Sequence, residues 1–321
     1  MGRVTSATLI AAQAGDGEAF AALVEPYRRE LHLHCYRILG SLDDADDAMQ
    51  EVLLAAWKGL PGFEGRSSVR TWLYRIATTR CLNTVRGHAR RPRLEPVPPF
   101  DPPTPSKAFD VPHLQPYPDA LIDELDPSHR AAARESIELA FVTALQRMPP
   151  RQTAALILCD VLDFPLREAA GILTTSPTAA KGLLQRARAS AAPFESRDAT
   201  AADRDVARRF AVAYAQDDVD GVISLLTDES WLAMPPATEC YVGRAAIGAF
   251  LRASAAGRPG GRYELVETSA AGRPAFVCYL QKRARGLLVI TPSADGTAIA
   301  SIMRFLDDGL HRHYDLPDVL D

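Results

Sequence analysis

The residues of this 321-residue chain that could do chemistry are charged, and they are segregated by sign. Five acidic residues and no basic one lie between Ser41 and Glu51, whereas eight arginines and no acidic residue lie from Arg66 to Arg93. A run of cations repels itself unless it meets an anion, and nucleic-acid phosphate is the obvious one. The acidic run either complements the start of a helix dipole or contacts a protein partner with a basic surface.

Aromatic residues accompany the arginine run, at Phe63, Trp72 and Tyr74. Cations that hold a backbone, combined with rings that stack on exposed bases, suit single-stranded DNA. The alternative for Phe63 and Trp72 is that both are core residues, because an isolated aromatic on a helix usually packs inward.

A second basic segment has the pattern of a helix-turn-helix. Apolar residues at helical spacing over Leu166–Leu173 predict a short helix, and Thr174-Thr175-Ser176 interrupts it. Ser176 is a good N-cap and Pro177 a good first-turn residue, so a second helix starts there. The alternative is an ordinary pair of helices in a bundle.

The second of these helices carries polar and basic residues outside its apolar positions. In a helix-turn-helix the beginning of the second helix enters the major groove. We therefore expect Thr178 and Lys181 to reach base edges, and Arg186 and Arg188 to fall near phosphates.

The elements that position these residues divide the chain into four segments. Residues 6–91 and 128–192 are predicted to be all-helical, with Gly40 ending one helix and Ser41 capping the next. Between them, ten prolines in the 27 positions 92–118 predict an extended linker over 92–127 that is not a folded element. Residues 203–321 mix helices with runs rich in β-branched and aromatic residues, which predicts an α+β domain.

Composition excludes several classes of protein. A hydrophobic content of 47% and a charged content of 24% are typical of a soluble globular chain. The five cysteines are scattered, and we find no signal peptide and no apolar run long enough to span a bilayer, so we expect a cytoplasmic protein. His32-Leu33-His34-Cys35 has poor spacing for a closed metal site, and we expect neither metal nor cofactor.

These motifs together resemble a known family. The stretch DDADDAMQEVLLAAWKGLPGFEGRSSVRTWLYRIATTRCLNTVR resembles conserved region 2 of extracytoplasmic-function RNA polymerase sigma factors, and ALQRMPPRQTAALILCDVLDFPLREAAGILTTSPTAAKGLLQRARA resembles their region 4. Residues 203–321 resemble the SnoaL-like domain, a cone of the nuclear-transport-factor-2 type. The implied fold is two all-α sigma domains, a Pro-rich linker and a C-terminal α+β cone.

The resemblance implies a role for individual residues. The part of region 2 that docks on core polymerase matches Asp47, Gln50, Glu51, Val52, Leu53 and Trp57. The part that opens and holds the -10 element matches Phe63, Arg66, Arg70, Thr71, Trp72, Arg75, Arg80, Asn83 and Arg86. The reader of the -35 element matches Ser176, Pro177, Thr178, Lys181, Gln185, Arg186 and Arg188.

The resemblance also implies a pocket inside the cone and an extended path for the linker through the polymerase. Candidate lining residues of a ligand pocket are Tyr214, Trp231, Met234, Tyr241, Phe276, Tyr279 and His313, although each could simply fill the core. His311 and His313 alternate along what we expect to be a last strand. We find no carboxylate partner for acid–base catalysis.

The implied function is promoter recognition and melting by a transcription initiation factor that binds core RNA polymerase and promoter DNA and is not itself an enzyme. We expect the C-terminal domain to be regulatory, with a small-molecule ligand. One alternative is a ligand-sensing helix-turn-helix regulator without sigma function; another is a SnoaL-like enzyme with a DNA-binding tail.

Overall fold

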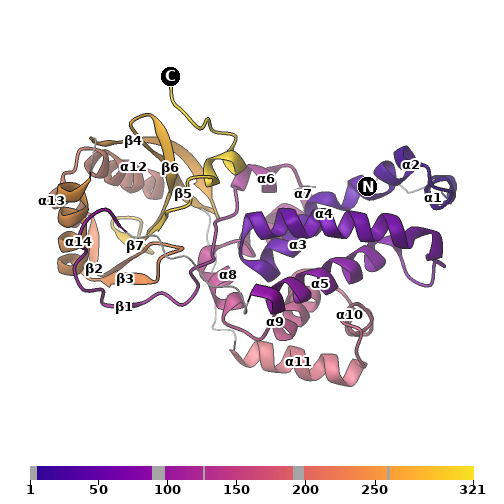
Figure 1. The fold of residues 1–321 in the computed structure, drawn as a ribbon. Coiled ribbons are helices and arrows are strands. Elements are labelled where there is room, and N and C mark those ends of the chain that lie inside the picture. Colours follow the sequence, from indigo (N-terminus) through magenta and orange to yellow (C-terminus); the bar gives the residue numbers. More distant parts are fainter. Residues whose placement is uncertain (1–5, 89–97, 126, 191–198, 259–260) are drawn as a thin grey trace. The chain divides into compact units, whose positions relative to one another are not determined.

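The computed structural model describes residues 6–88, 98–125, 127–190, 199–258 and 261–321, which form two compact units (Figure 1). The first unit comprises the described residues of 1–92, 125–132 and 140–194, and the second those of 93–124, 133–139 and 195–321. Within the described residues, no helix is long and apolar enough to cross a membrane.

The first unit is all-helical, as the sequence predicts. Its amino-terminal part contains α1 (Ser6–Gln13), α2 (Gly17–Val24), α3 (Arg28–Leu39), α4 (Leu42–Gly59) and α5 (Val69–His88). Gly40 ends α3 in the left-handed conformation, with φ of 72°, and the Ser41 hydroxyl accepts a hydrogen bond from Asp44 N–H at the start of α4. Both predicted helix signals are therefore confirmed.

The apolar spacing of each helix selects the face that it buries. On α4 the buried residues recur every three or four positions, at Leu42, Ala45, Ala48, Met49, Val52 and Ala56. Helix α3 is buried from Leu33 to Leu39 and contacts both α4 and α5. These three helices form the core that positions the charged residues of α4 and α5.

The carboxyl-terminal helices of the first unit are α9 (Pro150–Leu156), α10 (Leu166–Ile172) and α11 (Pro177–Ser190). A π-helical turn, Ile157–Val161, follows α9. Helices α7 (Pro127–Glu135) and α8 (Leu139–Gln146) contribute residues to both units.

A buried histidine makes the stability of the first unit depend on pH. His34 Nε2 shares a 2.9 Å hydrogen bond with Thr78 Oγ1, and its side chain is fully buried. Burial, followed by the charges of Arg37 and Arg70, lowers the pKa of His34 from 6.5 to about 3. The folded chain therefore binds this proton far more weakly than the unfolded chain does. The free energy of unfolding is unaffected by this group above pH 6.5 and falls as the pH drops from 6.5 toward 3.

We predict that a His34→Gln variant, which cannot titrate, loses about 2 kcal/mol less stability than the unaltered chain between pH 6 and pH 4.5. The measurement is urea unfolding followed by tryptophan fluorescence in a Trp231→Phe background, where Trp57 and Trp72 of the first unit are the remaining reporters. Equal losses in the two proteins would contradict a neutral, buried His34.

The second unit is built on a seven-stranded sheet with the order β1-β3-β2-β7-β6-β5-β4. Its strands are β1 (Lys107–Ala108), β2 (Leu226–Ala233), β3 (Glu239–Val242), β4 (Tyr263–Ala270), β5 (Arg273–Leu280), β6 (Arg283–Pro292) and β7 (Ile299–Phe305). Only the β2–β7 pair is parallel among these. The runs rich in β-branched and aromatic residues form β4–β7, and β1–β3 were not predicted.

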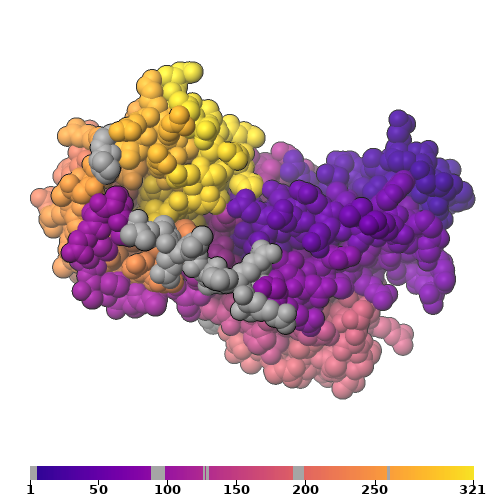
Figure 2. All heavy atoms as spheres, in the orientation of Figure 1, coloured from indigo at the N-terminus to yellow at the C-terminus, as the bar shows by residue number. Residues whose placement is uncertain are grey.

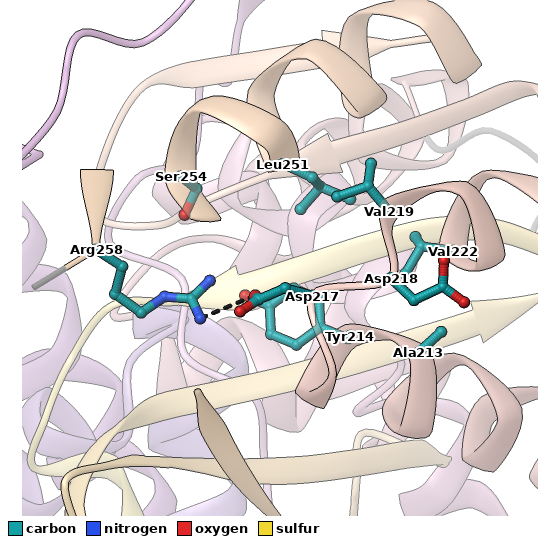
Figure 3. Close-up of a pocket in the computed structure, with 9 residues that line it drawn as sticks. All are labelled: Ala213, Tyr214, Asp217, Asp218, Val219, Val222, Leu251, Ser254 and Arg258. Atoms are coloured by element: carbon teal, nitrogen blue, oxygen red, sulfur yellow. Dashed lines mark hydrogen bonds and ion pairs between the residues drawn. The ribbon is translucent and has the colours of Figure 1, made fainter. Parts of the chain in front are cut away.

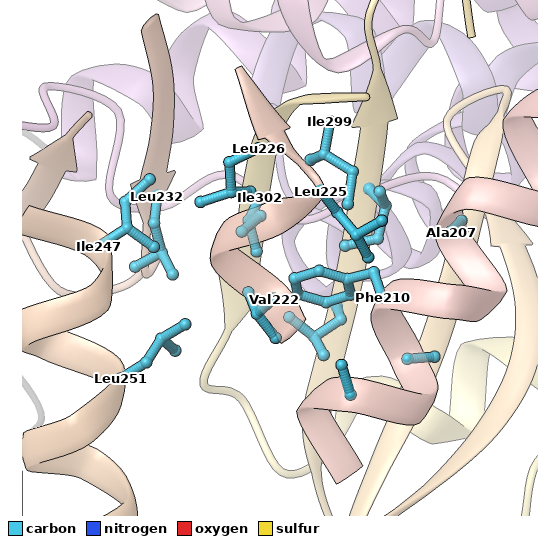
Figure 4. Close-up of a cluster of buried hydrophobic side chains, with 14 of the residues drawn as sticks. Ala207, Phe210, Val222, Leu225, Leu226, Leu232, Ile247, Leu251, Ile299 and Ile302 are labelled. Carbon is cyan, nitrogen blue, oxygen red and sulfur yellow. The ribbon is translucent and has the colours of Figure 1, made fainter. Parts of the chain in front are cut away.

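Helices α12 (Ala201–Ala215), α13 (Val219–Ser224) and α14 (Arg244–Gly257) pack against this sheet, and the short α6 (Asp119–Asp123) contacts β4 (Figure 1). Figure 4 shows the apolar side chains between them, in which Phe210 of α12 lies among residues of α13, α14 and the strands. This core is the expected α+β arrangement.

Candidate functional site

Helix α4 presents an acidic stripe to solvent. Asp47, Gln50 and Glu51 are exposed and follow one another at helical spacing. The stripe continues to Leu54, whose side chain is 53% exposed although it is apolar. The exposed leucine and the carboxylates therefore share the solvent-facing side of a helix whose other face is buried.

The apolar residues predicted for docking behave differently from one another. Val52 is fully buried in the helical core, so it cannot contact a partner. Leu53 is half-buried, and Trp57 is half-buried with its ring 5.1 Å from Phe20 in an edge-on arrangement. The sequence pattern missed Leu54; its helical position, seven residues after Asp47, was the signal that could have identified it.

Helix α5 exposes a basic and polar stripe. Its exposed members are Arg75, Thr79, Arg80, Asn83 and Arg86, spaced over three turns. Arg80 lies 3.8 Å from the Glu51 carboxylate of α4, and both groups remain largely in solvent. Such exposed pairs are weak, so these cations can exchange a carboxylate for a phosphate.

Other residues of the predicted -10 set contact neighbouring side chains of the first unit. Phe63 and Trp72 pack on each other with centroids 5.1 Å apart, against a small core that includes Leu23 and Leu60. Both rings are half-buried in this arrangement, and their packing agrees with the alternative that they belong to the core. Arg66 is exposed and pairs with the neighbouring Glu64.

Arg70 and Thr71 are also engaged. The Arg70 guanidinium donates to the Glu30 carboxylate at 3.2 Å, and it lies 4.7 Å above the Phe164 ring. Thr71 Oγ1 donates to Glu168 of α10 at 3.1 Å. Three arginines of the run are therefore not unpaired cations. Arg66, Arg70 and Arg80 each form an ion pair with a glutamate of the first unit.

The helix-turn-helix is confirmed as local structure. Helix α10 ends near Leu173, and Thr174 then adopts a left-handed φ of 49°, which turns the chain. The Ser176 hydroxyl accepts from Ala179 N–H at 3.2 Å, so it caps α11 as predicted. The buried face of α11 consists of Ala180, Leu184 and Ala187.

All seven residues predicted to read the -35 element are exposed on or just before α11. Thr178 and Lys181 lie in its first turns, where a recognition helix meets base edges. Arg188 is different because it forms a bidentate pair with Asp160, at 2.6 and 2.9 Å. That carboxylate would have to be displaced before Arg188 could contact a phosphate.

The Pro-rich segment is not the free linker that we expected. The described residues 98–124 belong to the second unit. Within it β1 adds to the edge of the sheet, where Lys107 lies opposite Cys240 and Ala108 opposite Glu239 of β3. Figure 2 shows this purple segment running over the surface of the orange C-terminal residues.

Hydrogen bonds on both sides of β1 extend this attachment. Ser106 N–H donates to Cys240 O at 2.9 Å, Ser106 Oγ accepts from Val242 N–H at 3.0 Å, and Phe109 N–H donates to Thr238 O at 2.6 Å. The prolines do not prevent this pairing, because an edge strand needs donors on one side only and the donors come from the residues between prolines.

The carboxyl-terminal end of the segment is attached at the opposite edge of the sheet from β1, at the turn between β4 and β5. Ala271 N–H donates to Tyr117 O, and Gly272 N–H donates to Asp119 Oδ1 at 2.8 Å. Burial raises the pKa of Asp119 to about 6, against the opposing effect of the Gly272 bond. We call residues 98–119 the linker strap.

A cavity of about 640 Å³ lies in the second unit, beside the linker strap. Three predicted pocket residues line it, namely Tyr214, Met234 and Tyr241. The other four do not line it. Phe276 belongs to the hydrophobic core of the unit, Tyr279 donates to Pro317 O, and Trp231 and His313 are not among the lining residues. Residues that the sequence missed include Arg258, Tyr263 and Arg304.

The expected last strand with two histidines is absent. Residues Leu310–Tyr314 instead form a 3-10 helix that follows β7. His311 is buried and His313 is half-buried, so they do not share an exposed face. In the part of the chain that the structure describes, no cluster of three or more His, Cys, Asp or Glu residues could hold a metal.

Comparison with known proteins follows the same division of the chain. The models described as Sigma-70 region 2, Sigma-70 region 4 and SnoaL-like domain match residues 23–91, 138–190 and 207–314. Over 315 residues the chain is 40% identical to the ECF RNA polymerase sigma factor SigG of Mycobacterium tuberculosis, covering 94% of this chain and 85% of the relative. It is 28% identical over 186 residues to SigM of the same species, covering 58% and 82%.

Among solved structures, the chain is similar to the crystal structure of the Mycobacterium tuberculosis extracytoplasmic function sigma factor SigJ. The TM-score is 0.59 at 20% sequence identity, and the match covers 93% of this chain and 99% of that one. This likeness shows a shared fold.

Proposed function

The chain belongs to the extracytoplasmic-function sigma factors, the subunits that bind RNA polymerase and recognise promoters, and on this premise we propose that its C-terminal unit regulates promoter recognition through the linker strap. The family assignment favours this role over that of a DNA-binding regulator that works without polymerase.

We assign the exposed stripes of the first unit as follows. The α4 stripe of Asp47, Gln50, Glu51 and Leu54 contacts the polymerase. The α5 stripe from Arg75 to Arg86 follows the backbone of the opened -10 strand, and the beginning of α11 enters the major groove of the -35 element. The support is exposure, helical spacing and charge, which is what docking and DNA contact require.

The observation that carries the regulatory proposal is the pairing of β1 with β3. The same residues cannot form an edge strand of the C-terminal sheet and also run as an extended segment through the polymerase. The paired state therefore competes with the polymerase-bound state, and any influence that favours one depletes the other.

A proline substitution tests this competition. Ser106→Pro removes the N–H that donates to Cys240 O and the hydroxyl that accepts from Val242 N–H. We predict a several-fold rise in run-off transcription by the reconstituted holoenzyme, on a promoter selected in vitro, because each lost bond is worth about 1 kcal/mol.

The matched control is Thr104→Pro, which places a proline in the same segment. Thr104 is exposed, and its N–H enters none of the hydrogen bonds described for this segment. Transcription by Ser106→Pro that is no higher than that of Thr104→Pro and the unaltered chain would rule out restraint by the linker strap.

A further inference from the structure

The cavity of the second unit has a cationic end. Arg258, at the end of α14, and Arg304, on β7, both line it. Their guanidinium carbons lie 4.3 and 5.5 Å from the ring of one residue, Tyr263. Two positive groups therefore lie close to a single aromatic side chain.

The described residues do not balance this charge. Figure 3 shows the pair of Arg258 with Asp217, whose Oδ1 is 2.9 Å from Arg258 Nη1, and among the described residues no carboxylate pairs with Arg304. Arg304 donates to the backbone carbonyls of Phe305 and Arg285, which are neutral. Two guanidiniums against one carboxylate leave an excess of one positive charge at this end.

Burial makes that excess costly. Arg304 is 5% exposed and the Arg258 side chain 9% exposed. Arg258 Nε is buried and has no hydrogen-bond partner among the residues that the structure describes. A buried cation without a counter-charge, next to an unused N–H donor, favours a ligand that supplies an acceptor with negative charge.

The rest of the lining is mostly apolar and aromatic. It includes Tyr241, Phe250, Met234 and Leu306, together with Phe100 of the linker strap. The Phe100 and Phe250 rings pack at 5.7 Å, and Tyr241 donates its hydroxyl to Pro103 O at 2.9 Å. Two acidic residues also line the cavity, namely Glu239, which is half-buried, and Asp308, which is exposed and pairs with Arg285.

We propose that the cavity binds an organic anion with a flat apolar body, its carboxylate toward Arg258 and Arg304 and its body along the apolar lining that Met234, Phe250 and Phe100 of the linker strap form together. A volume of about 640 Å³ suits a ligand of this class. This inference deepens the regulatory function proposed above, because Phe100 makes the strap one wall of the site.

The test uses the full chain and 2-naphthoate as the probe, with the neutral 2-naphthamide and the cationic 2-naphthylmethylammonium as matched compounds of similar shape. Isothermal titration is expected to show one site for the anion. We expect binding of the amide and of the cation to be weaker by about tenfold or more, since a charge-assisted bond to a buried guanidinium is lost.

Variants locate the anion. Arg304→Met and, separately, Arg258→Gln are each expected to reduce 2-naphthoate affinity about tenfold or more, while Arg283→Gln, at an exposed position of β6 outside the cavity, leaves it unchanged. Thermal melts identify a variant that does not fold, and the second variant then carries the test. Equal affinity for anion and amide, or no binding of 2-naphthoate by the folded chain, overturns the proposal.

The assay needs neither polymerase nor promoter, so it can fail independently of the regulatory function. Anion binding without any effect of Ser106→Pro on transcription would leave the ligand class intact and remove the role of the strap. A transcriptional effect without anion binding would do the reverse.

Discussion

In gel filtration, the Asp47→Lys/Leu54→Asp variant of this chain is expected not to co-elute with core RNA polymerase, whereas the unaltered chain co-elutes with it. Both positions lie on the exposed stripe of α4, one acidic and one apolar. Reversing one charge and placing another in an apolar contact each cost about 2 kcal/mol or more at a docking surface, so the Kd should rise about a hundredfold or more.

The design avoids Glu51, because its carboxylate lies 3.8 Å from Arg80 and a lysine there would also repel α5. Helix α12 offers a matched control, since Asp205 and Val212 are exposed and separated by the same seven residues. Asp205→Lys/Val212→Asp should bind polymerase like the unaltered chain. Co-elution of the α4 variant at undiminished affinity would exclude this stripe from docking.

The second large effect is expected on the -35 element. Thr178→Ala/Lys181→Ala should weaken promoter binding by the holoenzyme about a hundredfold, because each base-edge contact contributes about 1–3 kcal/mol of discrimination. Both side chains are exposed, so the fold should be unaffected. Binding to a promoter with an altered -35 sequence should change little, since those contacts are already lost there.

Arg186→Gln provides the contrast within the same helix. A phosphate contact carries no sequence information, so this variant should weaken binding to both DNAs alike and reduce the salt slope by about one. Arg209→Ala, an exposed arginine of α12, is the control that should change neither quantity. A uniform loss for Thr178→Ala/Lys181→Ala on both DNAs would contradict base reading at the start of α11.

Local signals accounted for the helical unit. Gly40, Ser41 and Ser176 mark helix ends through their own backbone preferences and hydroxyl groups, and the structure shows each in that role. The spacing of apolar residues correctly placed the buried face of α11. It assigned Val52 and Leu54 less well, because two faces of α4 carry apolar residues and only the packing of α3 and α5 decides which is covered.

The sequence by itself determined the order of the domains, the helix-turn-helix and the segregation of charge, because periodicity and capping act over a few residues. Only the tertiary structure decided that Phe63 and Trp72 pack together, that β1 joins β3 and that Arg258 and Arg304 share Tyr263. Residues 107 and 240 are paired across more than a hundred positions, and a proline-rich segment shows no alternation that predicts such a partner. Arg304, within the apolar run Ile299–Phe305, indicates a buried charge in the sequence. The second arginine of the site, Arg258, comes from the end of α14, and the sequence pattern does not connect the two.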